Sequence, residues 1–266
     1  MVEALKRNNV RVSGLAEGPT MVLAHGFGCD QQMWRFVVPS FEATHRVVLF
    51  DHVGAGGADP AAYDAARHAR LEGYAQDVVE IIDALDAGPV VFVGHSVSAM
   101  IGVLAARQRP ELFDRLVLVG PSPRYIDDGD YRGGFSQWEI DELLETMDDN
   151  YLGWSAHIAP VIMGVPDRPE LGEELTTSFC RTDPTLARRF ARTTFLSDNR
   201  ADLPHVTTPA LVVQCREDVI APMEVGEYVR DHLPHSDFAV LDAVGHCPNL
   251  SAPDQLVAAM KSYLAA

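Results

Sequence analysis

The sequence predicts an α/β fold in which a mostly parallel sheet is flanked by helices. Short apolar runs end in glycine, aspartate or proline, as buried strands of a parallel sheet do. Helical patterns separate most of these runs, and this alternation is typical of a sheet with helices on both faces. Of the 266 residues, 47% are hydrophobic and 22% are charged, which indicates a packed core and not a disordered chain.

Six runs are predicted to be strands of this sheet. They begin near Thr20, His45, Pro89, Arg115, Pro209 and Asp237. Residues 73–86 repeat apolar side chains at helical spacing, and residues 98–106 form an apolar helix directly after the run at 90–93. These strands and helices make up the predicted core of the chain.

The alternation fails between about residues 125 and 199, where no strand is expected. Apolar side chains recur every three or four residues from Leu143 to Ile158. Two further segments begin at Pro169 and Pro184, and proline costs nothing at the start of a helix. The segment is therefore predicted to be all helical.

A helical insertion after the strand that ends near Gly120 would cover the carboxyl edge of the sheet. Ligands bind at that edge in open α/β folds, so we interpret the insertion as a lid. We expect a core domain of residues 1–123 and 200–266, with residues 124–199 as the lid.

Acidic residues outnumber basic ones 38 to 21, for a formal net charge of -17. Such a surface repels phosphate backbones and anionic lipids, so neither nucleic acid nor a membrane is an expected partner. No apolar stretch approaches the length of a membrane span, and the N-terminal residues lack the apolar core of a signal peptide. A cytoplasmic location is predicted.

The four cysteines show no C-x-x-C spacing, which favours free thiols over zinc ligands or a disulfide framework. Cys29 follows the first strong strand and is expected to be a small core residue. No motif indicates a metal or an organic cofactor, so neither is expected.

Ser96 stands at the joint between the strand at 90–93 and the helix that follows it. The residue could be a helix cap, or it could be a nucleophile on a sharp strand-to-helix turn. Gly94 leaves room for such a turn, whereas Ser98 occupies the second glycine position of the G-x-S-x-G pattern. The nucleophile interpretation requires a base, an acid and an oxyanion hole elsewhere in the chain.

The chain supplies an acid and a base after the serine, at the ends of the last two predicted strands. Glu217 and Asp218 follow one strand, and His246 follows the next. Asp218 is favoured as the acid because Val219 and the residues after it suggest a loop folded over the site. Glu217 is expected to face solvent. Ser96, Asp218 and His246 are therefore the predicted catalytic triad.

Residues 25–28, HGFG, follow the first predicted strand and are typical of an oxyanion-hole turn. The backbone amides of Phe27 and Val97 are the expected donors. His25 is expected to make structural hydrogen bonds. His95 precedes the serine and is expected to point away from its hydroxyl.

With these residues assembled, the chain resembles the α/β-hydrolase superfamily over nearly its full length. More narrowly, it resembles the RsbQ-type branch, which includes a bacterial sigma-factor regulator and the plant karrikin and strigolactone receptors. The stretch GHSVSAM matches the plant-receptor form, so Ser98 is a family feature. The other stretches that carry the resemblance include HGFGCDQQMW, VLFDHVGAG, PELFDRLVLVGPSPRY, DNYLGW and GHCPNLSAP.

The resemblance implies an α/β-hydrolase fold whose lid is four helices arranged as a V over a deep apolar cavity. Sequence alone is equally compatible with a core position for most of the implied wall residues. Those residues are Phe27, Val97, Tyr125, Phe135, Trp154, Ile158, Phe195 and Val219.

Two functions are predicted. The first is a serine hydrolase of small apolar esters or lactones. The alternative is a signalling protein that binds or slowly hydrolyses a small hydrophobic ligand and engages a protein partner such as a phosphatase. Acyl transfer on the same triad is a third, weaker alternative. Sequence leaves open the natural substrate, the acyl acceptor and the oligomeric state, for which a monomer is the default.

Overall fold

A computed structural model describes residues 2–265 and contains a seven-stranded sheet in the order β1-β3-β2-β4-β5-β6-β7. The edge strand β1 is antiparallel to β3, and the other neighbours are parallel. The α/β prediction is confirmed. The strands are β1 (Arg11–Gly14), β2 (Thr20–Ala24), β3 (Arg46–Phe50), β4 (Val90–His95), β5 (Phe113–Val119), β6 (Ala210–Glu217) and β7 (Ser236–Val244).

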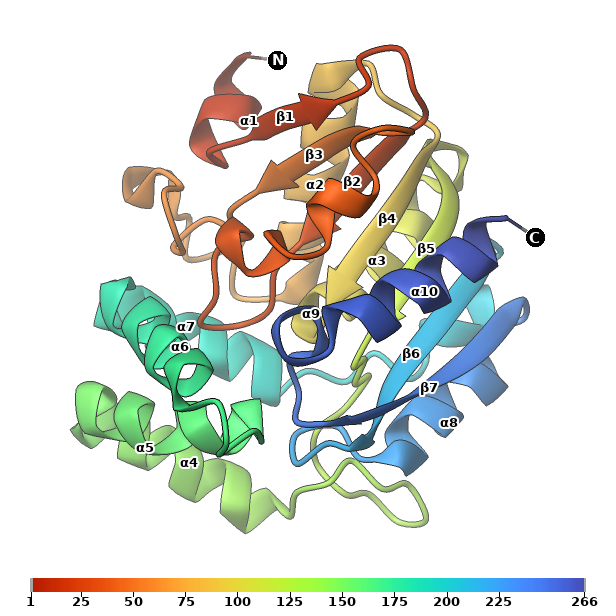
Figure 1. Cartoon of the computed structure of the whole chain (residues 1–266). Coiled ribbons are helices and arrows are strands. Elements are labelled where there is room, and N and C mark those ends of the chain that lie inside the picture. The colour runs from red at the N-terminus through yellow and green to blue at the C-terminus, as the bar shows by residue number, and fades with distance from the viewer. Residues whose placement is uncertain (1, 266) are drawn as a thin grey trace.

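Helices cover both faces of the sheet (Figure 1). Apolar side chains of α2, α3 and α8 pack in one core cluster, and those of α9 and α10 pack in the other, on the opposite face. These helices are α1 (Val2–Arg7), α2 (Leu71–Leu85), α3 (Val97–Gln108), α8 (Met223–His232), α9 (Pro248–Ser251) and α10 (Pro253–Leu264).

The six predicted strands are all present, and the seventh, β1, was missed. Every residue of β2 and β4 is buried, as expected for inner strands of a sheet covered on both sides. All four residues of β1 are exposed, and its sequence RVSG has no apolar run. Its pairing with β3, from Arg11 opposite Leu49 to Gly14 opposite Arg46, defines it as a strand.

Four helices occupy the segment between β5 and β6. Ser136 and Glu139 form a capping box that starts the first of them, and Asn150 and Asp183 cap two others. Residues 124–199 are all described and contain no strand of the sheet, in agreement with the predicted helical segment. The helices are α4 (Gln137–Asp149), α5 (Tyr151–Met163), α6 (Pro169–Arg181) and α7 (Pro184–Phe195).

Helices α4–α7 lie beyond the carboxyl ends of the parallel strands (Figure 1). Helix α5 packs against α4 and α6, and α4 also packs against α7. The division of the chain into a core and a lid stays a prediction. Among residues 2–265, no helix is both long and apolar enough to cross a membrane.

Candidate active site

Ser96 sits at a sharp turn between β4 and α3, with φ 58° and ψ −124°. A non-glycine residue rarely adopts positive φ, and this conformation raises the side chain above the edge of the sheet. The turn is so tight that a Cβ atom on Gly94 would lie 2.3 Å from the carbonyl oxygen of Ser98. The glycine at 94 is thus required by the turn.

The structure brings Ser96, His246 and Asp218 together in one hydrogen-bonded chain. His246 Nε2 lies 2.7 Å from Ser96 Oγ, and His246 Nδ1 lies 2.7 Å from Asp218 Oδ2. Ser96 starts helix α3, Asp218 follows β6, and His246 follows β7. All three side chains are nearly buried, with no more than 9% of any residue exposed.

Asp218 is held as a carboxylate by its surroundings. Burial opposes its ionisation, but His246 and the amides of Ala221 and Ile220 outweigh that effect and lower the pKa of Asp218. The two amides donate to Oδ1 at 3.1 and 2.8 Å. Oδ2 therefore faces the Nδ1–H of His246, so Nε2 is the nitrogen left to accept a proton from Ser96. Glu217 is exposed, as its predicted orientation requires.

A second histidine, His95, contacts the same site. Its Nε2 donates to the carbonyl oxygen of His246 at 2.7 Å, and the two ring centres are 5.0 Å apart. His95 lines the same cavity as Ser96, and its predicted orientation away from the serine hydroxyl stays a prediction. Burial and the neighbouring His246 lower the pKa of His95 to about 3, so the ring is neutral.

The amides of Phe27 and Val97 are free to bind an oxyanion. Neither donates a hydrogen bond to any group of residues 2–265. Val97 is the first residue of α3, where the helix dipole favours negative charge. Gly28 has φ +73°, and a Cβ atom there would lie 1.8 Å from the ring of Phe179, so the turn beside Phe27 also needs glycine.

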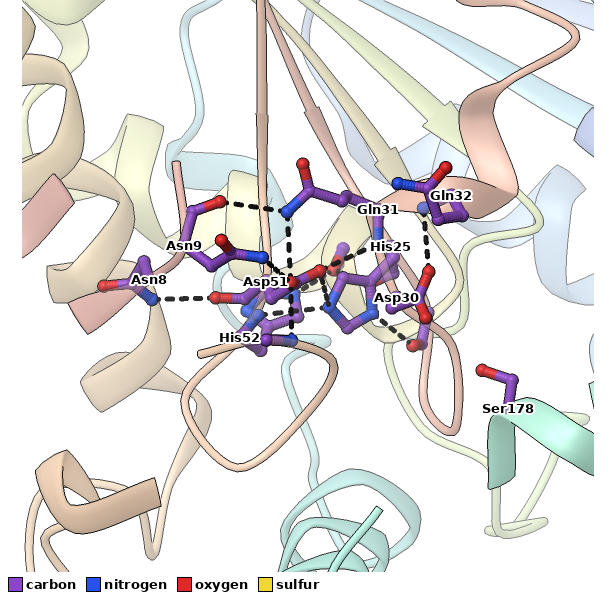
Figure 2. A network of polar contacts seen from close by, with 12 residues as sticks. Asn8, Asn9, His25, Asp30, Gln31, Gln32, Asp51, His52 and Ser178 are labelled. Carbon is purple, nitrogen blue, oxygen red and sulfur yellow. Dashed lines mark hydrogen bonds and ion pairs between the residues drawn. The ribbon is translucent and has the colours of Figure 1, made fainter. Parts of the chain in front are cut away.

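A polar network fixes both ends of this oxyanion loop, defined here as residues 25–31. At one end, the amide of His52 donates to His25 Nε2 at 3.1 Å, and His25 Nδ1 donates to the carbonyl of Gly26 at 2.8 Å. At the other end, the amide of Gln31 donates to Asp51 Oδ1 at 2.8 Å. Figure 2 shows Asp51 and His52, which directly follow β3, beside His25 and Gln31.

Ser98 joins the same network from the start of α3. Its hydroxyl donates to the carbonyl of His25 at 2.5 Å and lies 2.6 Å from His52 Nε2. Ser98 is fully buried. The burial of His52 and its proximity to His25 lower the pKa of His52 well below its ordinary value. Ser98, which replaces the second glycine of the G-x-S-x-G pattern, therefore connects the turn between β4 and α3 to the oxyanion loop.

Ser96 opens into a small cavity. Its walls are almost entirely apolar, and the only titratable side chains on them are histidine, cysteine and tyrosine. Burial raises the pKa of Cys29 to about 12 and that of Cys247 well above its ordinary value, so both thiols stay protonated. The lining residues are Phe27, Cys29, His95, Ser96, Tyr125, Ile162, Leu175, Phe179, Thr194, Phe195, Ile220, His246 and Cys247.

Three predicted wall residues, Phe27, Tyr125 and Phe195, line this cavity. Trp154 is buried one layer behind them, with its ring 6.4 Å from that of Phe27. Val97 is buried in the opposite core cluster and contributes only its amide to the site.

Three other predicted wall residues lie elsewhere. Phe135 and Ile158 are partly buried against the core without lining the cavity. Val219 is 54% exposed, and the next residue, Ile220, lines the cavity instead. The amide of Ile220 also donates a hydrogen bond to Asp218, which fixes this residue beside the triad.

Several lining residues carried no individual signal in the sequence. Leu175 and Phe179 are four residues apart on α6, which places them on one helix face, but that spacing does not distinguish a cavity from a core. Cys29 lines the cavity and is not simply a core residue. Within residues 2–265, no group of three or more histidine, cysteine, aspartate or glutamate side chains is arranged to hold a metal.

Residues 21–259 match the Alpha/beta hydrolase family. A strigolactone esterase from Arabidopsis thaliana is 41% identical, with coverage of 99% of this chain and 97% of that protein. A karrikin insensitive 2 receptor from Petunia hybrida is 40% identical over 97% of this chain and 95% of that protein. The structure of a hydrolase from Oleispira antarctica is 40% identical, covers 99% of this chain and 97% of its own, and superimposes with a TM-score of 0.96.

Proposed function

Because the chain belongs to the alpha/beta hydrolase family, we propose that it hydrolyses a small apolar ester or lactone with Ser96, His246 and Asp218 as its catalytic triad. The observation that carries this proposal is the continuous hydrogen-bonded chain from Asp218 through His246 to Ser96, which ends at an apolar cavity.

The geometry supports the following sequence of steps. Ser96 Oγ attacks the substrate carbonyl while its proton passes to His246 Nε2, and Asp218 stabilises the imidazolium. The amides of Phe27 and Val97 bind the tetrahedral oxyanion. The His246 proton then leaves with the alkoxide, and an acyl group remains on Ser96. A water molecule gives a proton to His246 and attacks that acyl group. The bond to Ser96 Oγ then breaks, the serine takes the proton back from His246, and the acid is released.

The side chains that line the cavity favour a compact, uncharged substrate. Neither a carboxylate nor a lysine or arginine lines it, and His95 is neutral, so an ionic group would lose its hydration without gaining a partner. A relative named as a strigolactone esterase supports lactones as well as open esters.

Intact-mass measurement tests the proposed nucleophile. The protein is mixed with a p-nitrophenyl ester and, separately, with a butenolide, and its mass is followed over time. We expect an acyl adduct that forms and decays, and that is missing from the Ser96→Ala protein. An equal adduct or equal turnover in Ser96→Ala would refute the assignment of Ser96.

A second function, ligand-dependent engagement of a protein partner, is supported by the surface of α5. This helix contains no charged residue, and its side chains Leu152 and Val161 are 56% and 45% exposed. The neighbouring helix α4 carries exposed acids that include Glu142 and Glu145. Basic side chains on a partner would complement these acids, and a relative is named as a receptor. A phosphatase is one such partner predicted from the family resemblance.

Turnover separates the two functions. An enzyme of metabolism releases the acyl group and cycles steadily on p-nitrophenyl esters. A signalling protein gives one burst of product and then stalls, because a long-lived adduct keeps the liganded state populated. Stopped-flow measurement of p-nitrophenol release distinguishes these outcomes.

A further inference from the structure

Thr194 on α7 places an unused hydroxyl at the cavity. The residue is 1% exposed and lines the cavity, yet its Oγ1 has no hydrogen-bond partner within residues 2–265. Several other hydroxyls on α4–α7 donate to the carbonyl four residues earlier, as Thr193 does to Arg189 at 3.1 Å and Ser155 does to Tyr151 at 2.7 Å. Thr194 departs from this pattern.

An unpaired hydroxyl is costly at this position. Thr194 lines the cavity together with Phe27, Ile162 and Phe195, so its surroundings there are mostly apolar. A valine would fill almost the same volume without leaving a buried polar group unsatisfied. The unpaired hydroxyl therefore lowers the stability of the folded protein without ligand. A bound molecule can supply the missing hydrogen-bond partner.

Tyr125 also has a buried hydroxyl without a hydrogen-bond partner among the described residues, but it belongs to the reacting end of the cavity. Burial raises the pKa of Tyr125 to about 12, with Ser96 acting in the opposite direction. Tyr125 lines the cavity together with Ser96. Thr194 comes from α7 and belongs to neither the triad nor the oxyanion loop, so its hydroxyl has no role in the catalytic steps proposed above.

We propose, on the basis of the function proposed above, that Thr194 donates a hydrogen bond to a neutral oxygen of the substrate outside the scissile ester. The acceptor is an ether, ring or carbonyl oxygen, because no cation lines the cavity to balance a carboxylate. The substrate class is therefore narrowed from apolar esters and lactones to those that carry a second neutral oxygen.

The proposal is tested with isosteric esters that differ by one atom. The probes are p-nitrophenyl pentanoate and two analogues in which an oxygen replaces one CH₂, the ethoxyacetate and the 3-methoxypropanoate. The intrinsic reactivities of the esters cancel when the ratio of kcat/KM, ether over hydrocarbon, is compared between protein variants. In Thr194→Val, we expect this ratio to fall about fivefold to tenfold for at least one ether, as for loss of one hydrogen bond.

Two matched variants control this measurement. Thr193→Val removes the adjacent hydroxyl, which is already bonded to carbonyl groups of Arg189 and His68, and should leave the ratio within about twofold, because that hydroxyl does not line the cavity. Thr194→Ser keeps the hydroxyl and should retain the preference for the ether. Thermal melting checks that each variant is folded.

A binding measurement keeps the inference separate from the catalytic proposal. Methyl esters of the same three acids are titrated by calorimetry into Ser96→Ala and into Ser96→Ala with Thr194→Val. A lower ether preference in the double variant supports the subsite even if the wild type hydrolyses nothing, in which case the proposed function alone fails. Unchanged ratios for both ethers, in catalysis and in binding, would overturn the role of Thr194.

Discussion

His246 Nδ1 and Asp218 Oδ2 are 2.7 Å apart, and the second oxygen of the same carboxylate accepts the amides of Ile220 and Ala221. Asp218 is therefore fixed by the backbone of its own loop before it orients the imidazole. This arrangement makes the tautomer of His246 depend on a negative charge at residue 218.

Asp218→Asn should lower kcat by about 10⁴, because an amide can donate to Nδ1 and so favours the wrong tautomer of His246. Ser96→Ala should cost about 10⁶ if the triad acts as a unit. Steady-state hydrolysis of a p-nitrophenyl ester measures both. Glu217→Gln is the matched control, since this neighbouring carboxylate is exposed and its loss should leave kcat unchanged within about twofold.

Asp218 should also make the folded protein sensitive to acid. Its pKa is lowered in the folded state, so the charged form contributes stability above the unfolded pKa, which is about 3.9. That contribution is lost as the pH falls from this value through the lower folded pKa. Urea unfolding at several pH values should show a free-energy difference between wild type and Asp218→Asn that shrinks on acidification. A difference that grows in acid would contradict the sign of the shift.

Ser98→Ala should impair the oxyanion hole without removing a reacting group. The Ser98 hydroxyl donates to the carbonyl of His25, directly before the turn that presents the Phe27 amide. We expect kcat to fall about tenfold with little change in KM, since misplacing one oxyanion donor costs less than the roughly 10²–10³ of removing it. Binding of a boronic acid, which resembles the tetrahedral intermediate, should weaken in parallel. Equal losses of substrate and boronate affinity would indicate a general disturbance of the cavity.

Much of the fold and the triad could be predicted because each depends on short segments. Buried parallel strands such as β4 are apolar throughout, and the order of Ser96, Asp218 and His246 places each at the end of a strand. The exposed edge strand β1 lacks any apolar pattern and is defined only by its pairing with β3. Long-range pairing of this kind leaves no local signal.

The cavity walls were harder to predict because they depend on orientation within a loop or helix. Val219 was predicted to line the cavity, but its side chain is exposed to solvent. The next residue, Ile220, lines the cavity. The hydrogen bonds of Asp51 and His52 to the oxyanion loop join residues 20 and 27 positions apart, and neither residue differs in type from an ordinary polar residue. Such contacts become visible only in the folded structure.

Phe179 should set the size of the acyl group that the cavity accepts. Its ring lies 5.6 Å from that of Phe27 and 5.4 Å from that of Trp154, and it lines the cavity at full burial. Phe179→Ala removes this wall and should destabilise the protein by about 3–5 kcal/mol, as measured by urea unfolding.

If the variant remains folded, its preferred p-nitrophenyl ester should shift from a short chain to one several carbons longer, because the enlarged space is apolar. Phe36→Ala serves as the control, since Phe36 is 47% exposed and its loss should change neither stability by more than about 0.5 kcal/mol nor the chain-length profile. An unchanged profile in a folded Phe179→Ala protein would mean that acyl groups occupy a different part of the cavity, away from α6.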